Sequence, residues 1–156
     1  MANTLLPDNA LAPMGAGLPS AIVASMLYPE RRMLAVCGDG GLMMNSREME
    51  TAAPLGLNLV VLILQDNAYG IIRGKQAVDG FANWGLSFGN PNFREVCRGV
   101  WRQGLAGEVA GGLAPTLEAA FNAGGLHIVV VPVDFSGNIR VLVVELRNSV
   151  PAAAPA

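Results

Sequence analysis

Residues 33–67 read MLAVCGDGGLMMNSREMETAAPLGLNLVVLILQDN, and this stretch decides the fold. It contains two apolar runs, 33–37 and 57–64, each followed at once by glycine or polar residues. Short apolar runs with such boundaries are typical of buried strands. A strand, a turn, a helix and a second strand within about 35 residues form the crossover unit of a parallel sheet.

The connection between the two runs has its own signals. The sequence GDGG at 38–41 predicts a turn. A helix is predicted over 47–55, with Asn45 or Ser46 as its N-cap and Gly56 as residue C′. Small polar side chains commonly begin helices and glycine commonly ends them.

The flanking segments continue the alternation of helices and strands. The pattern predicts a helix that ends at Pro29 and a helix over 90–100, with Asn90 as its N-cap and Pro91 as its first residue. It also predicts a helix over 114–124 and a strand over 128–133 whose Pro132 marks a sheet edge or a strand end. The stretch 68–90, rich in glycine, asparagine and aromatic residues, is predicted to be a long loop. The expected fold class is α/β, a parallel sheet with helices on both faces.

The composition limits the class of protein. The 156 residues suit one domain, and a hydrophobic content of 52% excludes a disordered chain. A net charge of −2 without a basic run excludes a nucleic-acid module, and no apolar stretch is long enough for a membrane helix. Only 14% of the residues are charged, against roughly 25% in ordinary soluble domains. Such a surface is expected to be covered by other domains or subunits.

Domain boundaries and location follow from the same pass along the chain. Residues 1–13 are predicted to be irregular, 14–147 to form the domain and 148–156 to be a disordered tail. The N-terminus lacks the pattern of a signal peptide. Cys37 and Cys97 have no metal-binding spacing, which favours two reduced buried thiols and a cytoplasmic location.

Two strand ends carry groups that could perform chemistry. Asp39 follows the first strand and Asn67 follows the second. Ligands of parallel sheets bind beyond the carboxyl ends of the strands, and carboxylate and amide oxygens suit Mg²⁺. Gly40 and Gly41 would let backbone N–H groups approach an anion such as a diphosphate. The alternative is a tight turn in which Asp39 only caps the loop.

These residues resemble a known family. Gly38-Asp39-Gly40, 25 further residues and Asp66-Asn67 are similar to the motif of thiamine diphosphate-dependent enzymes, except that Asp66 stands where the family usually has asparagine. Met14-Gly15-Ala16-Gly17-Leu18-Pro19 resembles the segment that precedes this motif in the family. The phrases at 44–73, 88–93 and 131–142 resemble the acetolactate synthase branch. The resemblance implies the diphosphate-side domain of the thiamine diphosphate-binding fold.

The resemblance also implies roles for single residues. Asp39 and Asn67 would ligate Mg²⁺ through their side chains, and Tyr69 would do so through its backbone carbonyl. Met14 would hold the cofactor in its bent form by packing between its two rings.

The diphosphate of the cofactor would lie against four further positions. Gly40 and Gly41 would meet it directly, with Gly70 and Ile71 in the loop beyond. Thiamine diphosphate and Mg²⁺ are therefore the expected cofactors.

A complete active site in this family needs a second domain, which supplies a glutamate to the pyrimidine ring. The chain is therefore expected to be a fragment or subunit of a transferase or lyase. By itself the chain is expected to be inactive, and it is expected to pair with a pyrimidine-side domain of the same enzyme or of a partner subunit. The implied reaction decarboxylates a 2-oxo acid and transfers the two-carbon unit to a second 2-oxo acid. The alternatives are a 2-oxo acid decarboxylase subunit and a non-catalytic cofactor-binding or interaction module. A homo-oligomer is expected in each case.

Other chemistry-bearing residues favour structural roles. His127 is the only histidine, and it begins a predicted strand. A structural role with its hydrogen bonds satisfied is therefore expected, and an ordinary Ser-His-Asp triad is not. Phe81, Trp84 and Phe88 in the long loop are expected to be packing or interface residues.

Overall fold

The computed structural model describes residues 5–7, 11–93, 95–96, 106–108 and 112–138. The chain divides into two compact units, which are described separately: Met1–Gln65 with Asn90–Pro132, and Asp66–Gly89 with Val133–Ala156. The first unit contains the sheet, and the second contains the segment that follows the second strand of the sheet along the chain.

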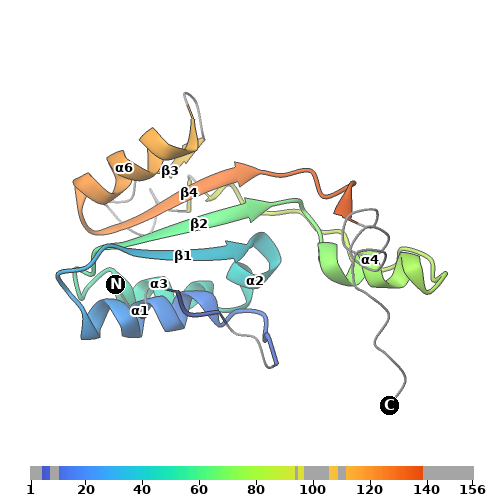
Figure 1. Cartoon of the computed structure of the whole chain (residues 1–156), viewed down its shortest axis with the longest axis horizontal. Coiled ribbons are helices and arrows are strands. Elements are labelled where there is room, and N and C mark those ends of the chain that lie inside the picture. Colours follow the sequence, from blue (N-terminus) through green and yellow to red (C-terminus); the bar gives the residue numbers. More distant parts are fainter. Residues whose placement is uncertain (1–4, 8–10, 94, 97–105, 109–111, 139–156) are drawn as a thin grey trace, which may run out of the picture. The chain divides into compact units, whose positions relative to one another are not determined.

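The sheet of the first unit has four strands among the described residues, in the order β1 (Met33–Gly38), β2 (Leu59–Gln65), β4 (Leu126–Pro132) and β3 (Ala106–Glu108) (Figure 1). Every neighbouring pair is parallel, as the sequence predicts. Gly38 is paired with Leu64, so β1 and β2 end at the same edge of the sheet. The short strand β3 was not anticipated, because a three-residue segment gives no periodic signal.

Strand β2 is the centre of the core. Its residues alternate between two apolar clusters: Leu59, Val61 and Ile63 pack on one side of the sheet, and Val60 and Leu62 pack on the other. A parallel strand covered on both faces has no solvent side, which is why its sequence is apolar without interruption. The predicted strand at 57–64 is confirmed with a shift of about two residues at its start.

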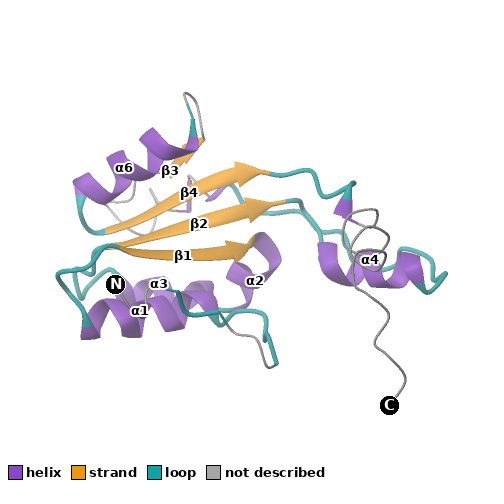
Figure 2. Ribbon diagram, in the orientation of Figure 1, coloured by secondary structure: helices purple, strands orange, loops and turns teal. Residues whose placement is uncertain are grey.

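Helices cover both faces of this sheet, as predicted (Figure 2). Helix α1 (Gly17–Leu27) and helix α3 (Met49–Ala52) contribute Leu18, Ile22, Met49 and Ala52 to the first cluster. Helix α6 (Leu113–Ala123) contributes Ala120 to the second. The buried residues Leu18 and Ile22 of α1 are four positions apart, and Met49 and Ala52 of α3 are three apart, so one face of each of these helices enters the core.

Strand β1 differs from the prediction of a buried strand. Ala35 is buried, but Leu34 and Val36 are exposed. The register places Leu34 beside Val60, on the face that α6 covers over β2 and β4. Because β1 lies at the sheet edge, α6 does not reach it, and an apolar sequence alone does not reveal that position.

The GDGG sequence does not form the predicted turn. Asp39 begins helix α2 (Asp39–Met44), and Gly38 is its N-cap in an extended conformation. The strand therefore passes into a helix without an intervening loop. A side chain at the first position of that helix is held close to the end of β1.

The helix predicted at 47–55 is shorter than expected. A 3-10 turn, η1 (Ser46–Glu48), precedes α3, and neither has a side-chain cap. The Asn45 side chain instead donates a hydrogen bond to the carbonyl of Gly15 at 3.1 Å. Pro54 lacks an N–H and follows the end of α3, while Gly56 has a φ of 62°, as a C′ glycine should.

The second unit contains a helix that the sequence analysis missed. Helix α4 (Gly70–Val78) lies within the stretch predicted to be a loop, and none of its residues is buried. Two backbone hydrogen bonds close the segment that surrounds it, from Tyr69 N–H to the Leu86 carbonyl at 2.9 Å and from Phe88 N–H to the Asn67 carbonyl at 3.1 Å. Two glycines within nine residues hid the helical pattern, because glycine disfavours helices.

The remaining predictions concern the first helix and the C-terminal half. The helix that ends before Pro29, helix α6 and the third strand are confirmed, and Pro132 stands at a strand end. The predicted N-cap at Asn90 is wrong, because helical structure begins at Phe93. The rest of that helix, Cys97 and the predicted tail lie outside the described residues. No helix in the described part of the chain is long and apolar enough to cross a membrane.

Candidate functional site

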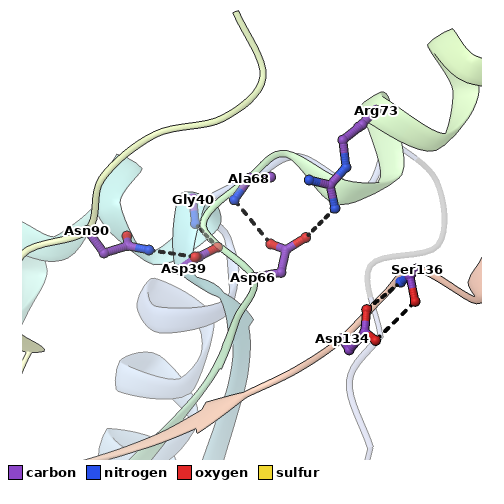
Figure 3. A network of polar contacts seen from close by, with 8 residues as sticks. All are labelled: Asp39, Gly40, Asp66, Ala68, Arg73, Asn90, Asp134 and Ser136. Atoms are coloured by element: carbon purple, nitrogen blue, oxygen red, sulfur yellow. Dashed lines mark hydrogen bonds and ion pairs between the residues drawn. The ribbon is translucent and has the colours of Figure 1, made fainter. Parts of the chain in front are cut away.

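Asp39 is the centre of the candidate site in the first unit. Its side chain is buried, with 1% of the residue exposed. One carboxylate oxygen, Oδ1, accepts a hydrogen bond from the Gly40 N–H at 2.8 Å, and the other, Oδ2, accepts one from Asn90 Nδ2 at 2.6 Å (Figure 3). A buried carboxylate held by two donors has a fixed orientation, as a metal ligand requires.

Asn90 is a site residue that the sequence analysis missed. Its place before Pro91 predicts a helix N-cap, but its side chain reaches Asp39 across 51 positions of sequence. A hydrogen bond to an ionised carboxylate is stronger than one between neutral groups. No local signal distinguishes this asparagine from the neighbouring Asn92, whose Oδ1 accepts the Glu95 N–H at 3.4 Å.

Two glycines at the start of α1 are required by close packing, Gly15 against the end of α2 and Gly17 against β1. Gly15 has a φ of 93°, and a Cβ there would lie 2.8 Å from Asn45 Nδ2. At Gly17 a Cβ would lie 2.9 Å from Cys37 Sγ. A Cβ at Gly41 would lie 3.8 Å from the backbone nitrogen of Gly15. The two glycine-containing motifs of the sequence therefore pack against each other in the first unit.

Asn67 lies in the second unit, two residues after the end of β2. It is exposed and has a φ of 57°, in the left-handed region that asparagine tolerates better than most residues. Its carbonyl is held by Phe88 N–H, and the rings of Phe88 and Tyr69 pack with centroids 4.9 Å apart. The backbone around Asn67 and Tyr69 is therefore fixed by contacts within this unit.

Asp66, the departure from the family pattern, shapes the same turn. Its Oδ1 accepts a hydrogen bond from the Ala68 N–H at 3.3 Å, and its Oδ2 lies 3.5 Å from a guanidinium nitrogen of Arg73 (Figure 3). A Cβ at Gly70 would lie 2.7 Å from the same Oδ2. The departure thus falls on a residue whose carboxylate contacts Ala68 in the turn and Arg73 in α4, while the expected ligand Asn67 is retained.

The expected site residues are divided between the two units. Asp39, Gly40, Gly41 and Met14 lie in the first unit, and Asn67, Tyr69, Gly70 and Ile71 lie in the second. Gly40 is buried, and Met14 and Ile71 are exposed. Their assignment to a common site therefore stays a prediction.

The residues assigned to structural roles have clear surroundings where they are described. His127 is buried in β4, and its Nε2 lies 2.7 Å from the carbonyl of Gly124. Phe88 packs on Tyr69, whereas Phe81 and Trp84 are exposed. Packing is therefore confirmed for Phe88, and Phe81 and Trp84 are left as interface candidates.

Two ionisable side chains, Cys37 and Asp134, have pKa values shifted from the ordinary ones. Burial raises the pKa of the Cys37 thiol, because the thiolate is poorly solvated there. Hydrogen bonds from the backbone N–H and the hydroxyl of Ser136 hold the pKa of Asp134 below its ordinary value (Figure 3). Asp134 is fully exposed, so this hydrogen-bonded turn orders the loop after β4 without excluding water.

Known proteins resemble most of this chain. The family model described as thiamine pyrophosphate enzyme, C-terminal TPP binding domain, matches residues 1–131. The catabolic acetolactate synthase of Raoultella terrigena is 34% identical over 88% of this chain, and the acetolactate synthase of Bacillus subtilis is 33% identical over 88%. The chain spans 24% of the length of each of these relatives.

Solved structures give the same result for the fold. The thiamine diphosphate-dependent 4-hydroxybenzoylformate decarboxylase of Rhodococcus jostii RHA1 matches 79% of this chain and 24% of its own, with a TM-score of 0.67 and 24% identity. The benzoylformate decarboxylase of Polynucleobacter necessarius covers the same shares, with a TM-score of 0.69 and 18% identity. The sheet, the GDG motif at the end of β1 and the sequence matches agree: the chain belongs to the thiamine pyrophosphate enzymes, as a C-terminal TPP-binding domain of the acetolactate synthase-like type.

Proposed function

We propose that this chain binds thiamine diphosphate and Mg²⁺ for an enzyme that decarboxylates a 2-oxo acid and transfers the two-carbon unit to a second 2-oxo acid. The observation that carries the proposal is the buried Asp39 carboxylate, fixed by two donors at the end of β1, in a chain of this family. The identity of about a third to acetolactate synthases favours carboligation over simple decarboxylation.

The residues present fit the metal. Mg²⁺ prefers oxygen ligands, and it binds proteins through one or two carboxylates together with phosphate oxygens. Asp39 supplies the carboxylate, and the amide oxygen of Asn67 and the carbonyl of Tyr69 complete the proposed protein ligands. Asn90 orients Asp39 through its 2.6 Å hydrogen bond, which is the usual function of a group behind a metal ligand.

Most of the proposed contacts with the cofactor are made at glycines. Gly40 and Gly41 leave room for a diphosphate because they carry no side chains, and Gly70 and Ile71 are proposed to border it from the other segment. Met14 is exposed ahead of α1 and is proposed to pack between the two rings of the cofactor. Bound thiamine diphosphate supplies the carbon nucleophile, and the residues of this chain anchor and bend it.

A partner domain is part of the proposal. The chain corresponds to 24% of its relatives' length, and we propose that a pyrimidine-side domain, on the same enzyme or on a partner subunit, supplies the activating glutamate. No residue of this chain is proposed to act as an acid or base in the reaction. A cytoplasmic location stays a prediction.

Calorimetry can test the metal and cofactor assignment. Thiamine diphosphate is titrated into the wild-type chain with Mg²⁺ and, separately, with EDTA; we expect binding only with Mg²⁺. Asp39→Ala should abolish this binding, whereas Asp134→Ala, which removes an exposed carboxylate, should leave it unchanged. Circular dichroism of each variant checks that the fold is intact. Equal heats with Mg²⁺ and EDTA, or full binding by Asp39→Ala, would contradict the proposal.

A further inference from the structure

Asp66 has a nearly buried carboxylate that the proposed metal and cofactor contacts do not include. Its side chain is 7% exposed, and it directly precedes Asn67, a proposed Mg²⁺ ligand. Burial of a carboxylate is unfavourable unless hydrogen bonds or an opposite charge compensate it. The contacts of this carboxylate therefore indicate what it does.

One carboxylate oxygen of Asp66 holds the residue between two proposed ligands. Oδ1 accepts a hydrogen bond from the N–H of Ala68 at 3.3 Å (Figure 3). Ala68 stands between Asn67 and Tyr69 in the chain. It is 4% exposed, so water does not readily replace the aspartate as its acceptor. An aspartate that accepts the N–H two residues ahead fixes the residue between them, which is Asn67 with its left-handed φ of 57°.

The other carboxylate oxygen, Oδ2, connects the turn to helix α4. It lies 3.5 Å from a guanidinium nitrogen of Arg73, which is in the first turn of that helix. Gly70 begins α4 and makes room for this oxygen, since a Cβ there would lie 2.7 Å from Oδ2. The carboxylate of Asp66 is therefore held from both sides, by the turn through Oδ1 and by the helix through Oδ2.

The neighbouring segment 86–88 holds the two proposed ligands by their backbone. The carbonyl of Asn67 and the N–H of Tyr69 each form a hydrogen bond with this segment, at 3.1 and 2.9 Å. The N–H of Ala68, between them in the chain, instead donates to Asp66. Loss of the Asp66 side chain would deprive this buried donor of that acceptor, and the turn would have to rearrange to satisfy it.

We propose that Asp66 is a positioning residue for the Mg²⁺ site, and that Gly70 is required because it admits the Asp66 carboxylate. Asp66 does not contact the metal; it sets the backbone that directs the Asn67 side chain and the Tyr69 carbonyl. The proposal rests on the proposed function, because it assumes that these two residues are ligands. The turn needs an acceptor at position 66, and Asp66→Asn keeps one.

Calorimetry measures the effect on the metal. Mg²⁺ is titrated into the whole chain with thiamine diphosphate in fixed excess. We expect Asp66→Ala to raise the dissociation constant of Mg²⁺ by about 10–100-fold, the usual effect of removing a group behind a metal ligand. Asp66→Asn should retain most of the wild-type affinity, because its amide oxygen can accept the same N–H. The matched control is Asp79→Ala, which removes an exposed carboxylate directly after α4 and should have no effect.

Urea denaturation without metal tests the contacts themselves. Gly70→Ala should lower the urea midpoint of the wild type, because its Cβ displaces the Asp66 carboxylate. Alanine favours a helix more than glycine does, so a lower midpoint cannot come from the helix itself. In the Asp66→Ala background the same substitution should leave the midpoint unchanged or raise it, since Oδ2 is absent. Circular dichroism checks that each variant is folded.

The outcomes separate this proposal from the proposed function. A wild-type chain that binds thiamine diphosphate without any dependence on Mg²⁺, or not at all, would overturn both. Wild-type binding that Asp66→Ala leaves unchanged would overturn the positioning role alone, as would Asp66→Asn binding as weak as that of Asp66→Ala. Equal shifts of the urea midpoint for Gly70→Ala in the two backgrounds would disprove the role given to Gly70.

Discussion

Replacement of Asn90 by alanine is the perturbation that most directly tests how Asp39 is held. The variant removes the donor that lies 2.6 Å from Asp39 Oδ2 and keeps the hydrogen bond from the Gly40 N–H to Oδ1. Asp39 is 1% exposed, so water does not readily replace the lost donor. Hydrogen bonds to charged groups contribute about 1.5–3 kcal/mol to stability.

The expected loss in the free energy of unfolding is therefore about 2 kcal/mol, which corresponds to a fall in Tm of roughly 4–8 °C for a chain of this size. Urea denaturation followed by circular dichroism measures it. The matched control is Asn122→Ala: Asn122 accepts a hydrogen bond from Arg32 at 2.9 Å on the surface, where such contacts contribute about 0–1 kcal/mol.

The same variant has a functional readout. If Asp39 is a Mg²⁺ ligand, the loss of the group that orients it should weaken Mg²⁺-dependent thiamine diphosphate binding by about 10–100-fold. Asn122→Ala should leave that binding unchanged. The reasoning is refuted if Asn90→Ala unfolds at the same urea concentration as Asn122→Ala, because Asn90 would then add nothing to the stability of the buried carboxylate.

Three further predictions concern packing, titration and activity. Gly17→Ala places a Cβ 2.9 Å from Cys37 Sγ and should lower the free energy of unfolding by about 1–3 kcal/mol, measured by urea denaturation. The control Gly89→Ala, whose Cβ would have no atom within 4 Å, should leave the free energy of unfolding unchanged. Equal urea midpoints of the two variants would contradict this prediction. Folding raises the pKa of Cys37, so the protonated thiol favours the folded state. This contribution to the free energy of unfolding is complete below the ordinary thiol pKa of about 8.5 and is lost as the pH rises through the raised pKa. Peptide mass spectrometry should find Cys37 alkylated by iodoacetamide at pH 8 more slowly than a free thiol, and an equal rate would show that it is not protected. The purified chain alone should not turn over pyruvate, and turnover free of host enzyme would disprove the need for a partner glutamate.

Much of the fold and of the motif could be predicted because the signals are local. The apolar run at 57–64 is typical of a strand covered on both faces, and the glycine-containing connection before it indicates a parallel crossover. Asp39 and Asn67 stand out for the same reason, since each lies within two residues of the end of a strand. The limits of local signals appear in helix α4, where glycines masked the helical pattern, and in the GDGG segment, where a helix starts without a turn.

The sequence by itself determined the parallel α/β sheet, the positions of the strand ends and the family motif, because these depend on residue type and spacing along the chain. Only the tertiary structure decided that Asn90 contacts Asp39 and that residue 17 must lack a Cβ because Cys37 packs against it. It also decided that β1 lies at a sheet edge, where Val36 is exposed. Each of these depends on which distant segments pack together. That choice is made by the burial of apolar surface across the whole unit, and no local pattern of residues records it.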